Sequence, residues 1–227
     1  MKQKFTILFD LDGTLVDTAP DLMLAHNHVM KKFGYPTKST EDIRNLVGKG
    51  AGALIGISIW GQAKKEFSKV LDAKIKDEMV KEFVNFYGKN IVNESTLVTG
   101  VKDFLIWCKE QNISMAVCTN KQEHLSNDLL KKIGIYDFFE YVAGSDTFDY
   151  CKPDPRHLTN VVEILDGDVK KTIMIGDSET DANAAKAAEI PVILLENGYT
   201  EKNTTEIYHN HLIKDFIGIE KIISKYL

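Results

Sequence analysis

Residues 9–18, FDLDGTLVDT, contain the pattern that decides the fold of this 227-residue chain. The run Phe5–Phe9 is short, apolar and rich in β-forming residues, which predicts a buried strand. Asp10 follows at the carboxyl end of that strand, Asp12 comes two residues later, and Gly13 permits a sharp turn. Because open α/β sheets bind ligands just outside the carboxyl ends of their strands, a binding site is expected here.

The two neighbouring carboxylates suggest particular chemistries. They repel each other unless a cation or a proton offsets the charge. Mg²⁺ is the expected cation, because it takes one or two carboxylates and shares its other positions with water and phosphate. An aspartate can also act as a nucleophile and pass through an aspartyl-phosphate. The alternative is an ordinary Asx-type turn, which Asp and Gly favour by themselves.

The composition is typical of a soluble globular protein, with 44% hydrophobic and 27% charged residues. The net charge of −5 argues against a general nucleic-acid binder, although a local basic pocket for a small anion is compatible with it. Three cysteines without a CxxC pair indicate reduced thiols. No apolar stretch approaches the length of a membrane span, and AGALIGISIW (51–60) is expected to be a packed helix. We therefore expect a cytoplasmic protein.

The sequence pattern changes along the chain. Residues 18–90 have helical spacing of apolar side chains and no convincing strand, whereas the chain after Leu97 alternates between helices and strands. This alternation predicts βαβ units and a parallel sheet, which the first strand must join. The fold class is therefore α/β, a Rossmann-like parallel sheet with an inserted helical lid over its binding edge. The predicted domains are the core, residues 1–16 and 92–227, and a small α-helical cap, residues 17–91.

The later strands also end in polar residues. Thr119 and Asn120 follow the second core strand, where a hydroxyl and the first N–H groups of a helix can bind an anion. Lys152 stands in KPDP as a point charge suited to phosphate. Asp177 and Asp181 in GDSETD lie one helical turn apart, so both carboxylates can face the same crevice. Each is ordinary alone as a helix cap or surface residue, but their order at successive strand ends predicts a joint phosphate and metal site.

These segments resemble the four signature motifs of the haloacid-dehalogenase-like (HAD) hydrolase superfamily. The matching stretches are DLDGT (10–14), CTN (118–120), KPDP (152–155) and GDSETD (176–181), which cover the core from end to end. The helical insertion after the first motif resembles the small cap of the superfamily's phosphatase branch. The second acid, Asp12, favours phosphate-ester hydrolysis, because the dehalogenases themselves lack an acid at this position and need no metal.

The resemblance implies catalytic roles for individual residues. It makes Asp10 the nucleophile and Asp12 the general acid/base, which would protonate the leaving alcohol and then activate water. Thr119 and Lys152 would bind the phosphoryl group, with Asn120 beside them in the substrate-binding set. Lys152 would also hold Asp10 in place.

The resemblance further implies a Mg²⁺ cofactor. Its ligands would be Asp10, Asp177 and the backbone carbonyl of Asp12, and Asp181 would be a further ligand or a support for the others. The cation and the lysine would together offset the charge between an anionic nucleophile and an anionic phosphate.

The substrate is sought in the cap. The segment IRNLVGKGAGAL (43–54) resembles the cap loop of phosphoglycolate phosphatases, which commonly show R-x-x-V-G-x-G. Arg44 is one of only two arginines among 28 basic residues, and arginine is hard to replace where a carboxylate needs bidentate binding. We predict that Arg44 and Lys49 face the crevice and recognise a small phosphate ester that carries a carboxylate.

The sequence thus predicts a Mg²⁺-dependent phosphomonoester hydrolase, most like the phosphoglycolate phosphatases, that acts through an aspartyl-phosphate. Its partner would be a small phosphorylated metabolite such as 2-phosphoglycolate, with no nucleic acid or membrane, and the protein would be a monomer or homodimer. A β-phosphoglucomutase-like phosphotransferase and a pyrophosphatase on the same scaffold remain alternatives. A non-catalytic sensor of a phosphorylated ligand is the alternative from outside the enzymes.

Overall fold

The computed structural model describes residues 4–48, 50–60 and 69–227 of the chain. The strands are β1 (Thr6–Phe9), β2 (Val16–Asp17), β3 (Thr96–Leu97), β4 (Ser114–Cys118), β5 (Tyr141–Ala143), β6 (Thr172–Gly176), β7 (Val192–Leu195) and β8 (His211–Ile213). The helices are α1 (Ala19–Phe33), α2 (Thr40–Arg44), α3 (Ala51–Trp60), α4 (Lys69–Lys89), α5 (Val101–Glu110), α6 (Glu123–Ile133), α7 (Arg156–Ile164), α8 (Glu179–Ala187) and α9 (Glu220–Ile223).

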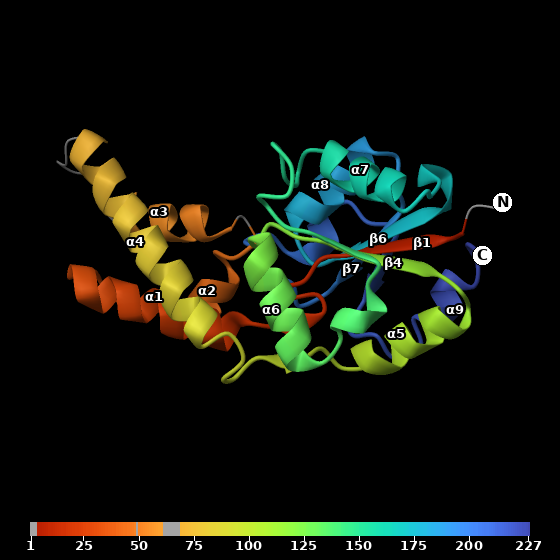
Figure 1. Cartoon of the computed structure of the whole chain (residues 1–227), viewed down its shortest axis with the longest axis horizontal. Helices are drawn as coiled ribbons and strands as arrows, with labels where there is room; N and C mark the ends of the chain where they lie inside the picture. Colours follow the sequence, from red (N-terminus) through yellow and green to blue (C-terminus); the bar gives the residue numbers. More distant parts are fainter. Residues whose placement is uncertain (1–3, 49, 61–68) are drawn as a thin grey trace.

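A six-stranded parallel sheet in the order β5-β4-β1-β6-β7-β8 forms the core (Figure 1). β1 lies inside it and pairs in the same register with β4 and β6, so that Thr6 stands opposite both Ser114 and Thr172. Parallel neighbours cannot be joined by tight turns, and helices therefore make the crossings between them. The predicted α/β fold with a parallel sheet is confirmed.

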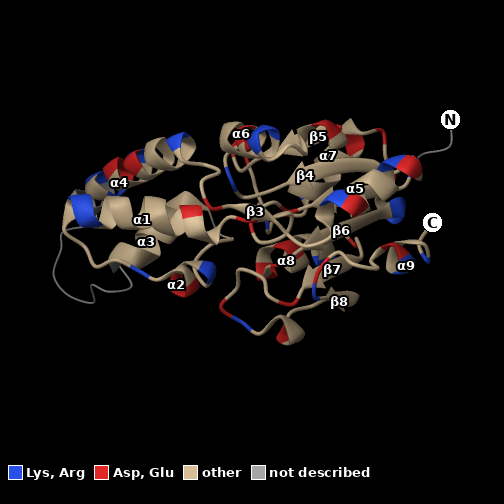
Figure 2. Cartoon of the chain, turned by 90° about the horizontal axis from the view of Figure 1, so that it is seen from below, with Lys and Arg blue, Asp and Glu red and all other residues tan. Residues whose placement is uncertain are grey.

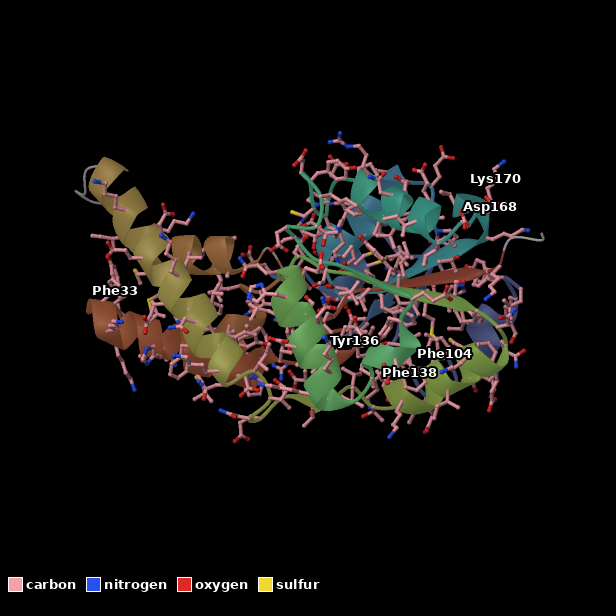
Figure 3. The ribbon with its side chains drawn as sticks, in the orientation of Figure 1. Phe33, Phe104, Tyr136, Phe138, Asp168 and Lys170 are labelled. Carbon is pink, nitrogen blue, oxygen red and sulfur yellow. The ribbon has the colours of Figure 1, made fainter. Side chains whose placement is uncertain are left out.

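Helices cover both faces of the sheet, with α7 and α8 on one side and α5 and α9 on the other (Figure 1). Every residue of β1 is consequently buried, and successive side chains enter opposite layers. Phe9 packs edge-on against Phe104 of α5, with ring centroids 6.2 Å apart, and Figure 3 shows Phe104 on this side of the sheet. Leu8 instead packs into the layer of Leu158 and Ala182, which belong to α7 and α8. This apolar packing on both faces fixes the position of the residue that follows β1.

Helices α1 to α4 lie apart from the sheet at one end of the molecule (Figure 1), and we refer to them as the cap. The chain enters the cap through β2 and returns through β3, and these two strands pair antiparallel with Val16 opposite Leu97. The sequence analysis did not anticipate this ribbon, because two-residue strands show no periodicity. It connects the cap to the sheet close to the end of β1.

The segment 51–60 forms helix α3, as expected from its apolar sequence. It carries no charged residue, and Figure 2 draws it in a single neutral colour. Leu54 and Ile55 are buried in the continuous apolar core that also contains α1 and α4 residues such as Val29 and Phe83. Among the described residues, the structure contains no helix both long and apolar enough to cross a membrane.

Candidate active site

The carboxyl ends of three strands meet at one edge of the sheet. Because β1 lies in register between β4 and β6, the residues that follow these strands come level with one another. These residues are Asp10, Thr119 and Asp177, and all three are buried. The backbone N–H of Asp10 donates to the carbonyl oxygen of Ile175 in β6 at 2.9 Å, which extends the ladder past the last strand residue. The fold therefore brings together three side chains that are far apart in the sequence.

Lys152 joins this group from the loop after β5. Its Nζ atom lies 3.0 Å from Oδ1 of Asp10 and 2.5 Å from Oδ1 of Asp181, and the side chain is buried. Burial alone would lower the pKa of Lys152, but the carboxylates of Asp10 and Asp181 outweigh it and raise that pKa. The lysine thus remains a positive charge beside Asp10, and its catalytic role stays a prediction.

Asp10, Asp177 and Asp181 form a buried acidic cluster. Each offers one carboxylate oxygen, and these three atoms lie within 4.8 Å of one another. Burial first, and then the charge of Asp181, raise the pKa of Asp10 to about 7. Burial and the charges of Asp10 and Asp181 raise the pKa of Asp177 well above its ordinary value. One lysine therefore does not neutralise the cluster, and a set of hard oxygen donors with surplus negative charge fits Mg²⁺.

Two further groups hold Asp177 in place. The Thr14 hydroxyl donates to its Oδ1 at 3.1 Å, and the backbone N–H of Tyr199 donates to its Oδ2 at 2.6 Å. Gly13 packs directly against the same carboxylate, since a Cβ atom built on it would lie 2.2 Å from Oδ2 of Asp177. Gly13 thus serves a close approach as well as the turn, at a φ of +82°.

Asp181 is already engaged on both of its carboxylate oxygens. Oδ2 accepts hydrogen bonds from the hydroxyl and the N–H of Ser178 and from the N–H of Asp177, in a capping box at the start of α8. Oδ1 accepts from Lys152. Of the two roles implied by resemblance, this arrangement suits a support for Lys152 and Asp177 better than a primary ligand.

Asp12 is paired with a residue that sequence analysis missed. Nζ of Lys121 lies 2.8 Å from both carboxylate oxygens of Asp12, and the Thr18 hydroxyl donates to Oδ1 at 2.7 Å. The ammonium also lies 4.4 Å from the centre of the Tyr87 ring, a cation–π contact from α4 of the cap. The available signal was its place directly after the CTN motif, where the chain turns into the site.

Asn120 links the cap to the core. Its amide nitrogen donates to the carbonyl oxygens of Gly48 and Lys152, each at 3.0 Å. Gly48 follows α2 in the cap, so this side chain connects the cap to the loop that carries Lys152. Thr119, beside it, accepts a hydrogen bond from the N–H of Lys121 at 3.2 Å.

A cavity of about 230 Å³ lies between the cap and the end of the sheet, and we call it the main cavity. Asp10, Asp12 and Thr119 line its floor. The described residues on its cap side are uncharged and include Leu22, Leu54, Val80, Phe83 and Tyr87. The predicted nucleophile and acid/base residue therefore open into one shared space under the cap.

Of the residues predicted to bind the substrate, Asn120 lines the main cavity, whereas the two cap residues lie elsewhere or cannot be placed. Nη2 of Arg44 is 2.7 Å from Oδ2 of Asp17, and its guanidinium lies 5.4 Å from the centre of the Tyr199 ring. Arg44 lines a different cavity, beside the β2–β3 ribbon, and does not line the main cavity in this structure. Lys49 lies outside the described residues. The role of both in recognition stays a prediction.

The sequence of residues 7–195 matches the family model of the haloacid dehalogenase-like hydrolases. The chain belongs to that family. The four motifs identified in the sequence all fall inside the matched region, and their side chains form the site described above. The predicted superfamily is thereby confirmed.

Relatives that match over most of the chain specify the group within this family. A phosphoglycolate phosphatase of Mesorhizobium japonicum is 37% identical over 210 residues, which cover 92% of this chain and 90% of the relative. A phosphoglycolate phosphatase of Caulobacter vibrioides is 38% identical over 218 residues, covering 95% and 89%. This HAD hydrolase is therefore a phosphatase of the phosphoglycolate phosphatase-like group, as the sequence predicted.

Solved structures agree in fold. A crystal structure from Haemophilus somnus 129pt, described as a predicted phosphoglycolate phosphatase, matches with a TM-score of 0.89 and 31% identity, over 98% of this chain and 99% of that one. A β-phosphoglucomutase from Clostridium difficile matches with a TM-score of 0.79 and 23% identity, over 98% and 97%. The second similarity concerns the fold alone, and it shows that one architecture accommodates hydrolases and mutases.

Proposed function

We propose that this phosphatase hydrolyses small phosphomonoesters, such as 2-phosphoglycolate, through attack by Asp10 and an aspartyl-phosphate. The observation that carries the proposal is that Asp10 and Asp12 line one cavity while Lys152 is fixed against Asp10 at 3.0 Å. The relatives named phosphoglycolate phosphatase support the choice of substrate. Helices α1 to α4, within residues 17–91, would act as the lid, and three free cysteines fit a reducing compartment such as the cytoplasm.

Asp10 is the nucleophile in this proposal. Its carboxylate attacks phosphorus, the ester bond to the leaving oxygen breaks, and the phosphoryl group becomes attached to Asp10. Lys152 counters the negative charge that nucleophile and phosphate bring together, and it stays charged because its pKa is raised. The hydroxyl of Thr119, which lines the same cavity at the start of the loop into α6, would hold a phosphoryl oxygen.

Asp12 moves the protons. As a carboxylic acid it gives a proton to the leaving alcohol, and as a carboxylate it later takes one from the water that attacks the aspartyl-phosphate. Lys121 and Thr18 orient its two oxygens at distances of 2.7–2.8 Å. The products are the free alcohol and inorganic phosphate, and Asp10 is regenerated.

Mg²⁺ would be held by Asp10 and Asp177, with Asp181 supporting them and the backbone carbonyl of Asp12 as a further ligand. When bound, it would supply positive charge that offsets repulsion between the nucleophile and the phosphate. The chain's own contribution is to keep Asp177 oriented, through Thr14 and the N–H of Tyr199.

Release of inorganic phosphate from 2-phosphoglycolate tests the proposal. We expect release with Mg²⁺, none with EDTA, and none from Asp10→Asn at any Mg²⁺ concentration. Asp103→Asn, at an exposed position on α5, is the matched control and should keep full activity. Full activity in Asp10→Asn would refute the assignment of the nucleophile.

The same phosphate-release assay, run on sugar phosphates and pyrophosphate, separates the alternative functions that share this fold. A phosphotransferase would convert a sugar phosphate into its isomer without releasing phosphate, and a pyrophosphatase would prefer pyrophosphate over every ester. A non-catalytic sensor would bind a phosphorylated compound and release nothing.

A further inference from the structure

A cation of the core faces the main cavity. Among the described residues that line this cavity, Lys121 is the only one with a positive charge. Lys152 is not part of the lining, because it is enclosed between Asp10 and Asp181. The described cap residues in the lining are apolar or small, so within the described part of the chain Lys121 is the cation that a negatively charged substrate group can meet.

The surroundings of Lys121 keep its ammonium group at one place. The residue is only 9% exposed, its Nζ donates to both oxygens of Asp12, and the Tyr87 ring lies 4.4 Å from it. An ammonium has three N–H donors, and Asp12 takes at most two of them. Lys121 lines the main cavity beside Asp12, so a third hydrogen bond to a group in the cavity is compatible with its two bonds to Asp12.

This position has a consequence for the substrate. Asp12 is proposed to protonate the leaving oxygen, so Lys121, at 2.8 Å from Asp12, lies close to the atoms that are bonded to that oxygen. In a phosphate ester of a small 2-hydroxy acid, such as 2-phosphoglycolate, the carboxyl carbon is two bonds from the ester oxygen. Its carboxylate can therefore reach Lys121 while the phosphoryl group lies at Asp10.

We propose that Lys121 is the specificity-determining residue that selects phosphomonoesters of small hydroxy acids, by pairing with the substrate carboxylate. The inference rests on the proposed function and deepens it. It differs from the expectation for Arg44, whose guanidinium is bound to Asp17 at the β2–β3 ribbon. A buried ammonium next to an apolar cap surface discriminates strongly, since a neutral substrate leaves its charge without a second partner.

The test compares 2-phosphoglycolate with ethyl phosphate, which lacks the carboxylate. The measurement is kcat/KM for 2-phosphoglycolate divided by kcat/KM for ethyl phosphate. A loss of acid/base function at Asp12 slows both esters and therefore cancels in this ratio. We expect Lys121→Met to lower this ratio about tenfold to a hundredfold, the range of a charge-assisted hydrogen bond, with most of the change in KM. Lys121→Arg should restore part of the ratio, since a guanidinium also pairs with carboxylates. Lys102→Met, at an exposed position on α5, is the matched control and should leave the ratio unchanged.

Contrary results are equally definite. If Lys121→Met slows both esters by the same factor, Lys121 only positions Asp12 and the proposal is wrong. If Arg44→Met or Lys49→Met lowers the ratio instead, recognition belongs to the cap. Lys121→Gln, which keeps a donor toward Asp12, gives the same comparison should Lys121→Met fold poorly. A wild-type enzyme that releases phosphate from neither ester refutes the proposed function, and this inference with it.

Discussion

Lys152 and Asp181 form a buried ion pair at 2.5 Å, although one lies in the loop after β5 and the other on the first turn of α8. Asp181 also accepts the N–H groups of Asp177 and Ser178 at the start of its own helix, so its carboxylate is held independently of the lysine. This ion pair holds Nζ of Lys152 at the end of the sheet, where it lies 3.0 Å from Oδ1 of Asp10. The position of Lys152 therefore depends on a loop and a helix end that only the folded sheet brings together.

Removal of this lysine should destabilise the metal-free protein strongly. Lys152→Met leaves the carboxylates of Asp10 and Asp181 buried without their cation, which costs about 3–5 kcal/mol in the free energy of unfolding. Urea denaturation in EDTA measures this change. The control is Lys202→Met, which breaks an exposed pair with Glu179 and should change stability far less. A Lys152 variant as stable as the wild type would mean that the cluster is protonated and needs no lysine.

Gly13→Ala should disturb the Asp177 carboxylate. The new Cβ atom would lie 2.2 Å from Oδ2, and it must displace the oxygen proposed to bind Mg²⁺. We expect a weaker rise of melting temperature on adding Mg²⁺, together with loss of phosphatase activity. Gly34→Ala is the matched control, because Gly34 has a similar φ of +77° but no atom within 4 Å of the added carbon. That control carries only the backbone strain, about 1–2 kcal/mol, and should keep its Mg²⁺ response.

The core of the site was predictable because its residues follow buried strands in the sequence. Asp10, Thr119 and Asp177 each come directly after a fully buried apolar run, and a parallel sheet places such positions side by side. The contacts of Lys121, Tyr199 and Asp17 were not predictable, since they depend on how the cap sits against the core. The spacing of apolar residues indicates which face of a helix is buried, but it does not indicate which residues of the cap contact the core.

Arg44 illustrates the same limit. Its scarcity and its place in the cap segment pointed to a ligand, but Asp17 of the entering strand β2 lies within 2.7 Å and holds it. The partner is 27 residues away and belongs to a ribbon too short to leave a sequence pattern. The sequence singled out Arg44 as a candidate binding residue, whereas its pairing with Asp17 is visible only in the structure.

His157 should make the protein less stable in mild acid. It is fully buried on α7, and burial, followed by the charge of Lys152, lowers its pKa from 6.5 to about 4. The unfolded chain therefore binds more protons than the folded protein between these values, and stability falls as pH drops from 6.5 toward 4. The contribution of this one group reaches about 3 kcal/mol.

His157→Gln provides the measurement, because glutamine does not titrate. The difference in unfolding free energy between wild type and variant should shift in favour of the variant as pH is lowered from 7.5 to 4.5. Comparing the two proteins at equal pH cancels the site carboxylates, which titrate in the opposite sense. A difference that stays constant over this range would contradict the buried neutral state of His157.

Asp17→Asn should loosen the cap. Asp17 accepts a hydrogen bond from Arg44 of α2 on one oxygen and from the hydroxyl of Tyr199 on the other, and Tyr199 in turn holds Asp177 through its N–H. These donors outweigh burial and lower the pKa of Asp17, so at neutral pH it is a carboxylate that binds both. An amide loses the charge and can orient only one oxygen toward the two donors. We expect faster amide hydrogen exchange in the segment 40–48 and an unchanged rate in α5.

Asp128→Asn, at an exposed position on α6, is the control. Arg44→Ala should accelerate exchange in the same segment, and the double variant Asp17→Asn/Arg44→Ala should add nothing further, because the two residues form one link between the cap and the core. Additive effects of the two substitutions would show instead that each residue holds the cap by a separate contact.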